Sequence, residues 1–162
     1  MKLTKAEYRT LLRNDMHTFS ERAFRELNPS VPFLDNWHIE VMTSKLGACR
    51  RGEITRLIGN VPPRSLKSHL AAVAFPAFLL GHDPHAQIIC ASYGQDLANK
   101  HSLDCRNLMA SEWYKGLFPT RLSPQKQSLQ EFATTQNGFR LATSVGGVLT
   151  GRGADFIIID DP

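Results

Sequence analysis

The run FIIIDDP at residues 156–162 restricts the possible folds of this chain more than any other stretch. Four apolar residues in succession are typical of a buried strand, and two carboxylates follow directly. A strand with one solvated face alternates apolar and polar residues, so this run predicts a strand covered on both faces. Strands of this kind are typical of α/β folds, and we predict an α/β protein with a largely parallel sheet.

Further strand patterns precede this run. Residues 53–61 (EITRLIGNV) and 86–93 (AQIICASY) read as strands, the second of them buried. Residues 131–144 read as a hairpin around Asn137 and Gly138, a pair that suits a tight turn.

Helical patterns alternate with these strands. Residues 67–81 predict a helix that Pro76 bends or breaks. Ser92 and Gln95 form a capping-box pattern for a helix that ends near residue 110. Strands that alternate with helices are the signature of an α/β sheet.

The first part of the chain is predicted to be helical. Thr4 and Glu7 match a capping box, and the helix they open ends at residues 28–29. A second helix is predicted over about 37–51, with Gly52 as its stop signal. We therefore expect a helical lead-in over residues 1–52 and a core over residues 53–162.

Composition is ordinary for a soluble domain. The 162 residues are 42% hydrophobic and 21% charged, which is enough for one domain with a core. No apolar run approaches the roughly 20 residues that span a bilayer, and the first ten residues lack a signal-peptide pattern, which favours the cytoplasm and no membrane partner. The net charge of +4 weakly favours a polyanionic partner. The three cysteines predict reduced, mostly buried thiols rather than a metal site, and residues 82–85 (HDPH) predict a turn.

Residues 61–72 (VPPRSLKSHLAA) nearly spell a phosphate-binding loop, which follows a strand and opens a helix. Val61 and Leu66 stand where that loop has glycines, and Lys67 and Ser68 are its last two letters. The two prolines have no N–H, but the five amides of residues 64–68 could still surround an anion at the helix N-terminus. Leu66 fits if its φ is negative and its side chain points away from the phosphates. The alternative is a helix N-terminus that binds nothing.

Asp160 and Asp161 match the second nucleotide-binding motif, in which a buried strand carries an acid to the carboxyl edge of the sheet. Asp160 would hold Mg²⁺, and Asp161 would orient the attacking water, although Asp is one methylene shorter than the common Glu. The alternative is a solvated turn after a strand. The two motifs in this order, about ninety residues apart, together predict an ATPase.

Three longer stretches resemble the large terminase subunit of tailed bacteriophages, the motor that packages DNA into procapsids. They are NVPPRSLKS, LLGHDPHAQIICASYGQDLA and TTQNGFRLATSVGGVLTGRGADFIIIDDP, and the resemblance covers roughly residues 30–162. It implies a P-loop NTPase fold of the additional-strand, RecA-like class, with ATP and Mg²⁺ as cofactors. The implied partners are double-stranded DNA without sequence specificity, a portal protein, a small terminase subunit and further copies in a homo-oligomeric ring.

The resemblance also implies roles for single residues. Ser65, Leu66 and Lys67 would contact phosphates, Ser68 and Asp160 would serve Mg²⁺, and Asp161 would be the catalytic acid. Arg64 would sense or stabilise the γ-phosphate. Arg152 is a candidate arginine finger or DNA contact, with a plain exposed arginine as the alternative. Trp37 and His38 are candidate adenine contacts, with a core tryptophan as the alternative.

The family continues after the second motif with a coupling segment and a nuclease domain, whereas this sequence stops at Pro162. We therefore expect a fragment or truncated product that lacks at least one strand of the sheet and has no nuclease residues. Two other functions remain open: a helicase-like DNA-dependent ATPase, and a non-catalytic remnant of a defective prophage.

Overall fold

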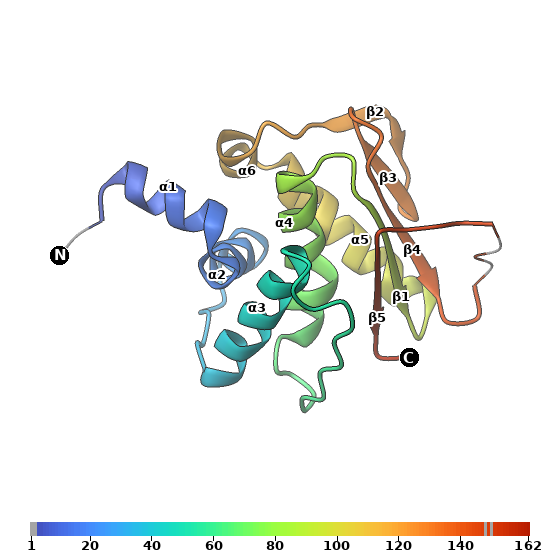
Figure 1. The fold of residues 1–162 in the computed structure, drawn as a ribbon, viewed down its shortest axis with the longest axis horizontal. Coiled ribbons are helices and arrows are strands. Elements are labelled where there is room, and N and C mark those ends of the chain that lie inside the picture. The colour runs from blue at the N-terminus through green and yellow to red at the C-terminus, as the bar shows by residue number, and fades with distance from the viewer. Residues whose placement is uncertain (1–2, 148, 150) are drawn as a thin grey trace.

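A mixed, open sheet of five strands is the centre of the computed structural model, which describes residues 3–147, 149 and 151–162 (Figure 1). Its strand order is β2-β3-β4-β1-β5. The bounds are β1 Gln87–Ser92, β2 Leu122–Gln127, β3 Glu131–Thr134, β4 Phe139–Ser144 and β5 Phe156–Asp160. The central strand β1 runs parallel to both β4 and β5, whereas β3 is antiparallel to β4 and β2 is antiparallel to β3. The α/β class is confirmed, and the prediction of a largely parallel sheet is corrected to a mixed one.

The antiparallel half of the sheet has a local cause. The predicted hairpin forms as β3 and β4, and Asn137 adopts the positive φ of +68° that a tight turn needs. Strand β2, which was not predicted, extends this hairpin outward. Its six residues include Pro124, which suits a strand at the edge of a sheet.

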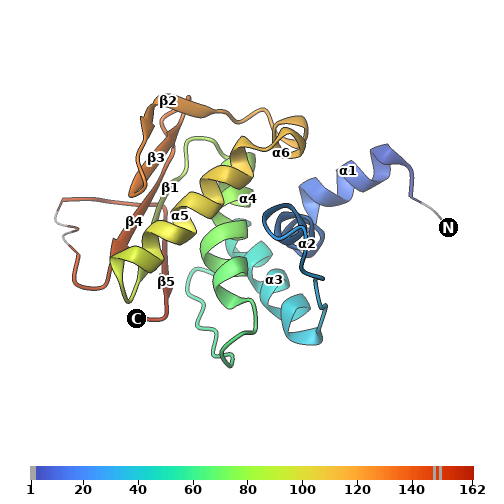
Figure 2. The same ribbon diagram turned by 180° about the vertical axis from the view of Figure 1, so that it is seen from behind.

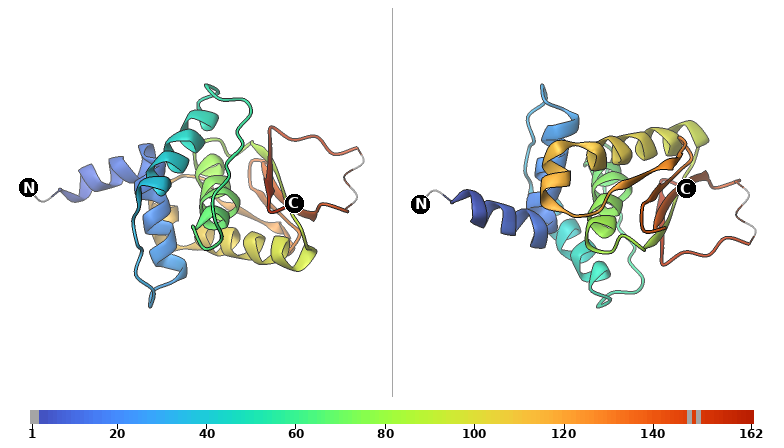
Figure 3. Two further views of the ribbon diagram at one scale, coloured as in Figure 1. Left: turned by 90° about the horizontal axis from the view of Figure 1, so that it is seen from below. Right: turned by 90° about the horizontal axis from the view of Figure 1, so that it is seen from above.

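The helices pack against one face of the sheet. Their bounds are α1 Lys5–Asn14, α2 Met16–Leu27, α3 Trp37–Arg50, η1 His69–Ala74, α4 Phe75–His82, α5 Gln95–Ala110 and α6 Glu112–Leu117. Figure 2 shows α5 lying across the sheet, and Figure 3 shows the helices on one side only. Buried residues of α1, α2 and α3 join those of η1, α4 and α5 in a single hydrophobic cluster. No helix within the described residues is long and apolar enough to cross a membrane.

The covering of β5 on both faces was wrongly predicted. Phe156 and Ile158 pack toward the helices, but Ile157 and Ile159 have exposed fractions of 65% and 61%. Side chains alternate between the two faces of a strand, so these two lie on the face opposite Phe156 and Ile158, and Figure 3 shows the helices on one side of the sheet only. Four consecutive apolar residues therefore do not distinguish a strand buried on one face from one buried on both.

The strand predicted over residues 53–61 does not form. The segment runs without strand pairing from the end of α3 to the loop over residues 61–68, and Ile58 is 89% exposed. A strand needs a neighbour to accept its hydrogen bonds, and no described strand lies beside this segment or along the outer edge of β5. The apolar pattern alone was therefore insufficient to predict it.

The first predicted helix is divided into two. The Thr4–Glu7 capping box is present at the start of α1, but Asp15 leaves the helical conformation with ψ of +113°. Its carboxylate accepts hydrogen bonds from the amide and hydroxyl of Thr18 and caps α2. This local side-chain bond competes with a continuous helix. Helix α3 and its stop at Gly52, where φ is +74°, are as predicted.

Pro76 does not break its helix, and a π-helical segment comes directly before it. The helix that begins after the loop passes through η1 and continues as α4. Pro76 has no N–H for the carbonyl of Ala72, and Arg140 Nη2 of β4 donates to that carbonyl at 2.8 Å. Arg140 is fully buried, so this bond ties β4 to the helix next to the loop.

The capping box predicted at Ser92 and Gln95 is absent. Ser92 is the last residue of β1, and Gly94 is the N-cap of α5 without a side-chain bond. The Gln95 side chain instead contacts Asn99 and the carbonyl of Ala142 in β4. Ser92 is thus paired as part of β1 and does not cap α5.

Candidate functional site

The carboxyl ends of the three parallel strands meet at one edge of the sheet. Ser144 of β4, Ser92 of β1 and Asp160 of β5 are aligned in register there. Ligands of open α/β sheets bind at this edge. The loop over residues 61–68 reaches the same edge, because Lys67 contacts the residue that follows β5.

Lys67 Nζ donates to Asp161 Oδ1 and forms an ion pair with it, although 94 positions separate the two residues. The Lys67 side chain is partly covered, and that of Asp161 is about half exposed. Asp161 has a φ of +50°, which turns the chain sharply at the end of β5. The ammonium and the carboxylate thus lie at one place on the surface, within reach of a ligand from solvent.

The loop has the backbone geometry of an anion nest. Arg64 and Leu66 have φ of +63° and +62°, whereas Ser65 between them and Lys67 after them do not have positive φ. Alternation of left-handed and right-handed residues turns successive N–H groups toward one concave side. The N–H of Leu70 donates to the carbonyl of Leu66. The N–H groups of residues 66–69 come before this first helical donor, so the helix itself offers them no acceptor.

Leu66 does not meet the condition of a negative φ, because its φ is +62°. A left-handed conformation costs a side-chain-bearing residue about 1–2 kcal/mol. The Leu66 side chain offsets part of this cost because it is half-buried and packs against the hydrophobic core. The Leu66 side chain therefore points away from the concave side of the loop. The Leu66 backbone has the left-handed conformation that suits the glycine found at this position in the common loop sequence.

Three further side chains of the loop have different environments. Ser65 is buried, and its hydroxyl donates to the carbonyl of Pro62 at 2.7 Å, which holds the loop in shape. Ser68 has helical φ and ψ and forms no capping bond, so its hydroxyl is not used by the backbone. Arg64 is exposed.

Asp160 lies beneath this surface. Its side chain is 6% exposed, and His101 of α5 lies beside it with 3.6 Å between Nε2 and Oδ2. Within the described part of the chain, neither of these two buried atoms has a hydrogen-bond partner. Burial lowers the pKa of His101 below its ordinary value, and the neighbouring Asp160 opposes this shift in part.

Sequence reasoning missed His101. The available signal was its place on the buried face of α5, in line with Ala98, Cys105 and Leu108. A histidine at such a position needs a polar partner. The identity of that partner depends on how α5 crosses the sheet, which the sequence pattern does not give.

Trp37 and His38, the candidate adenine contacts, begin α3 beside the loop. His38 Nε2 donates to the carbonyl of Ser65 at 3.1 Å, which joins α3 to the loop. Trp37 is 72% exposed, so it is not a core tryptophan, and its indole face is accessible next to the loop.

Arg152 lies at the opposite end of the sheet from Lys67. Its guanidinium pairs with Glu131 at 2.9 Å and lies over the ring of Phe139, the first residue of β4. Arg152 is exposed, as its alternative predicts, but it makes these two contacts. Residues 148 and 150 of the string SVGGVLTGRGADF, which carries part of the family resemblance, lie outside the described residues.

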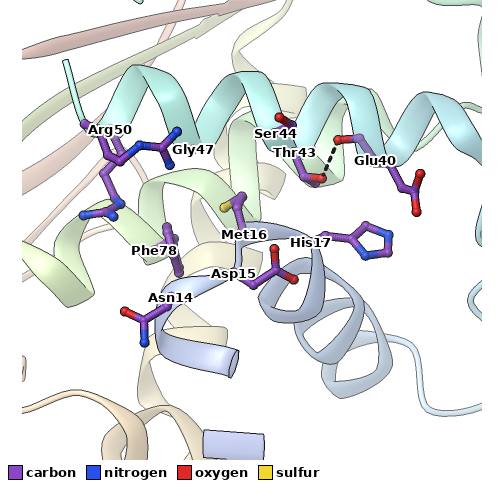
Figure 4. Close-up of a pocket in the computed structure, with 11 residues that line it drawn as sticks. Asn14, Asp15, Met16, His17, Glu40, Thr43, Ser44, Gly47, Arg50 and Phe78 are labelled. Carbon is purple, nitrogen blue, oxygen red and sulfur yellow. Dashed lines mark hydrogen bonds between the residues drawn. The ribbon is translucent and has the colours of Figure 1, made fainter. Parts of the chain in front are cut away.

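A cavity of about 450 Å³ lies elsewhere, between the α1–α2 junction and α3 (Figure 4). Asp15, Glu40 and Arg50 line it. Its charges are mixed, and it is remote from the sheet edge, so we do not assign the nucleotide motifs to it. Among the described residues, no three His, Cys, Asp or Glu side chains gather as a metal cage. A magnesium ion held mainly by substrate phosphates does not need one.

The three cysteines are free thiols, and two of them, Cys90 and Cys105, are buried. Burial raises the pKa of the Cys105 thiol to about 12. The prediction that the cysteines are mostly buried is thus confirmed.

Comparison with protein-family models gives no match for this chain, and comparison with curated proteins gives none. The functional assignment therefore depends on the geometry of the site and on the resemblance in sequence.

Proposed function

We propose that this chain binds ATP at the loop over residues 61–68 and is the ATPase part of a DNA-packaging motor of the terminase large-subunit type. One observation carries the proposal: a loop with alternating backbone handedness holds its lysine against the carboxylate that follows the last parallel strand. Loop, lysine and acid are the parts that a P-loop ATPase needs.

The charges of the site suit a triphosphate. The amides of the loop, the first turn of the helix and Lys67 all present positive charge to the concave side, and exposed Arg64 adds another. Asp161 pairs with Lys67 in this structure. A bound phosphate would take the place of this partner and release the Asp161 carboxylate to accept a hydrogen bond from a water molecule.

The residues present also fit Mg²⁺, because the unused Ser68 hydroxyl and the Asp160 carboxylate are oxygen ligands of the kind it prefers. When bound, the ion would neutralise charge on the phosphate oxygens during transfer. Asp160 would hold it, and Asp161 would orient the attacking water. Trp37 and His38 would border the base.

Work on DNA would need a ring of copies. Arg152 is far from Lys67 of its own chain, so a role as arginine finger would require the site of a neighbouring copy. Such a motor grips DNA through phosphates rather than bases, because packaging ignores sequence. We infer a portal protein and a small terminase subunit as the other partners.

Titration with a fluorescent ATP analogue, with Mg²⁺ and with EDTA, tests the proposal. We expect saturable binding to the unaltered chain that Lys67→Ala weakens about tenfold or more, which corresponds to at least 1.4 kcal/mol. Lys115→Ala, a change of a partly exposed lysine on α6, is the matched control and should leave binding unchanged. Binding that survives Lys67→Ala would contradict the assignment. An unaltered chain that binds no nucleotide would favour the non-catalytic remnant.

A further inference from the structure

Asp160 and His101 form a buried polar pair that the proposed ATPase chemistry does not itself explain. Their side chains are 6% and 9% exposed, so both are largely out of water. Atoms that are buried in this way almost always have hydrogen-bond partners in folded proteins. Here Asp160 Oδ2 and His101 Nε2 have none among the described residues, and they face each other at 3.6 Å.

The pair is held in place from both sides. Asp160 ends β5 in register with Ser92, and His101 lies on the face of α5 that packs onto the sheet. On the outer side of the same turn of α5, Lys100 pairs with Asp104, so these two charges do not compete for Asp160. A cavity of about 340 Å³ borders His101 on the side of α2 and η1. A hydrogen bond between the two side chains needs a shift of roughly 0.5 Å from the 3.6 Å that separates Nε2 and Oδ2.

We propose that His101 is a positioning residue for Asp160, with its Nε2–H donating to Oδ2 so that the other carboxylate oxygen is directed to the metal. This inference rests on the proposed function, because it assigns Asp160 to Mg²⁺. Carboxylates that hold metals are commonly fixed by a hydrogen bond of this kind. Among the described residues, no hydrogen bond or ion pair joins His101 to the nucleotide loop or to Asp161, so we infer that it acts through Asp160.

Two substitutions separate positioning from simple packing. His101→Leu removes the donor and keeps an apolar side chain of similar size, whereas His101→Gln keeps an N–H donor at a similar reach. We would titrate Mn²⁺ onto the full chain saturated with ADP and measure free Mn²⁺ by electron paramagnetic resonance. We expect His101→Leu to weaken Mn²⁺ affinity about 10–100-fold and His101→Gln to restore most of it. ADP affinity in EDTA should be the same for all three proteins.

His85→Leu is the matched control, since His85 is exposed in the turn before β1, at the opposite end of that strand from Asp160. It should bind Mn²⁺ as the unaltered chain does. Unchanged Mn²⁺ affinity in His101→Leu, or an equal loss in His101→Leu and His101→Gln, overturns the positioning role and leaves the proposed function intact. An unaltered chain that binds no Mn²⁺ with ADP overturns both.

A measurement on the unaltered chain covers the case in which His101→Leu does not fold. Nitrogen NMR of the histidine side chains should show Nε2 of His101 protonated, with a resonance that shifts when Mg²⁺ and ADP are added together. ADP alone should not shift it. A resonance that is insensitive to Mg²⁺ with ADP overturns the proposal.

Discussion

The ammonium of Lys67 and the carboxylate of Asp161 form an ion pair at the carboxyl edge of the sheet. The pair is partly exposed, so its own contribution to stability is small. Its importance is that each partner must leave the other before a phosphate can bind to the lysine.

Asp161→Asn should therefore raise affinity for nucleotide without metal. The substitution removes the carboxylate that competes with phosphate for Lys67, and we expect ATP to bind a few-fold more tightly in EDTA. Fluorescence titration measures this change. Glu112→Gln removes an exposed carboxylate on α6 and should have no effect. Weaker binding to Asp161→Asn would show that the ion pair does not compete with the nucleotide.

Arg64 offers a test of strain in the loop. Arg64→Gly and Arg64→Ala both remove the cation, but only glycine accepts a φ of +63° without steric cost. Arg64→Gly should therefore be more stable than Arg64→Ala by about 1 kcal/mol in urea unfolding, while both bind ATP more weakly. Equal stability of the two variants would mean that the loop is not held in the left-handed conformation.

The hairpin turn tests how β1 and β4 are held together. A Cβ on Gly138 would come within 2.3 Å of the carbonyl oxygen of Pro84, which is backbone and cannot move aside. We expect Gly138→Ala to destabilise the fold by about 2 kcal/mol. Gly116→Ala on α6, where a Cβ meets no neighbour, should be neutral or stabilising by up to about 1 kcal/mol. Equal urea midpoints for the two variants would contradict this packing.

Stability should fall as pH falls from 7.5 to 5.5. Burial is the main cause that lowers the pKa of His69, His82 and His101 in the folded chain. Between the ordinary value of about 6.5 and these lower values, the unfolded chain binds more protons, so acid favours unfolding. Each such histidine steepens the dependence by at most about 1.4 kcal/mol per pH unit. Urea midpoints at several pH values measure it.

His69→Gln provides the control for this dependence. His69 is one of the histidines that bind a proton more readily in the unfolded chain. Its substitution should therefore reduce the slope of stability against pH by at most about 1.4 kcal/mol per pH unit. Midpoints that are constant or rise at pH 5.5 would show that these histidines are already charged in the folded state.

Local patterns predicted much of the fold because their causes are local. The turn at Asn137 and Gly138 and the helix α3 with its stop at Gly52 depend on neighbours in sequence. The prediction of a strand over residues 53–61 was wrong because a strand also depends on a partner strand, which the local pattern does not show. The exposure of Ile157 likewise depends on which faces the helices cover.

The candidate site shows the same division. Lys67, Asp160 and Asp161 could be named from motifs, because those residue types recur where phosphate chemistry takes place. The left-handed φ of Leu66 depends on the packing of its side chain into the core. His101 could not be assigned to Asp160 from sequence, because their proximity arises only when α5 crosses the sheet.

Metal-directed cleavage tests the central claim, that the loop and the end of β5 form one metal–nucleotide site. Fe²⁺ would replace Mg²⁺ with ADP bound, and ascorbate with peroxide would generate radicals that cut the backbone near the metal. Mass spectrometry of the fragments should show cuts near Ser68 and also near Asp160, both lost in Lys67→Ala. Cuts at only one of these segments, or cuts that persist in Lys67→Ala, would contradict the account.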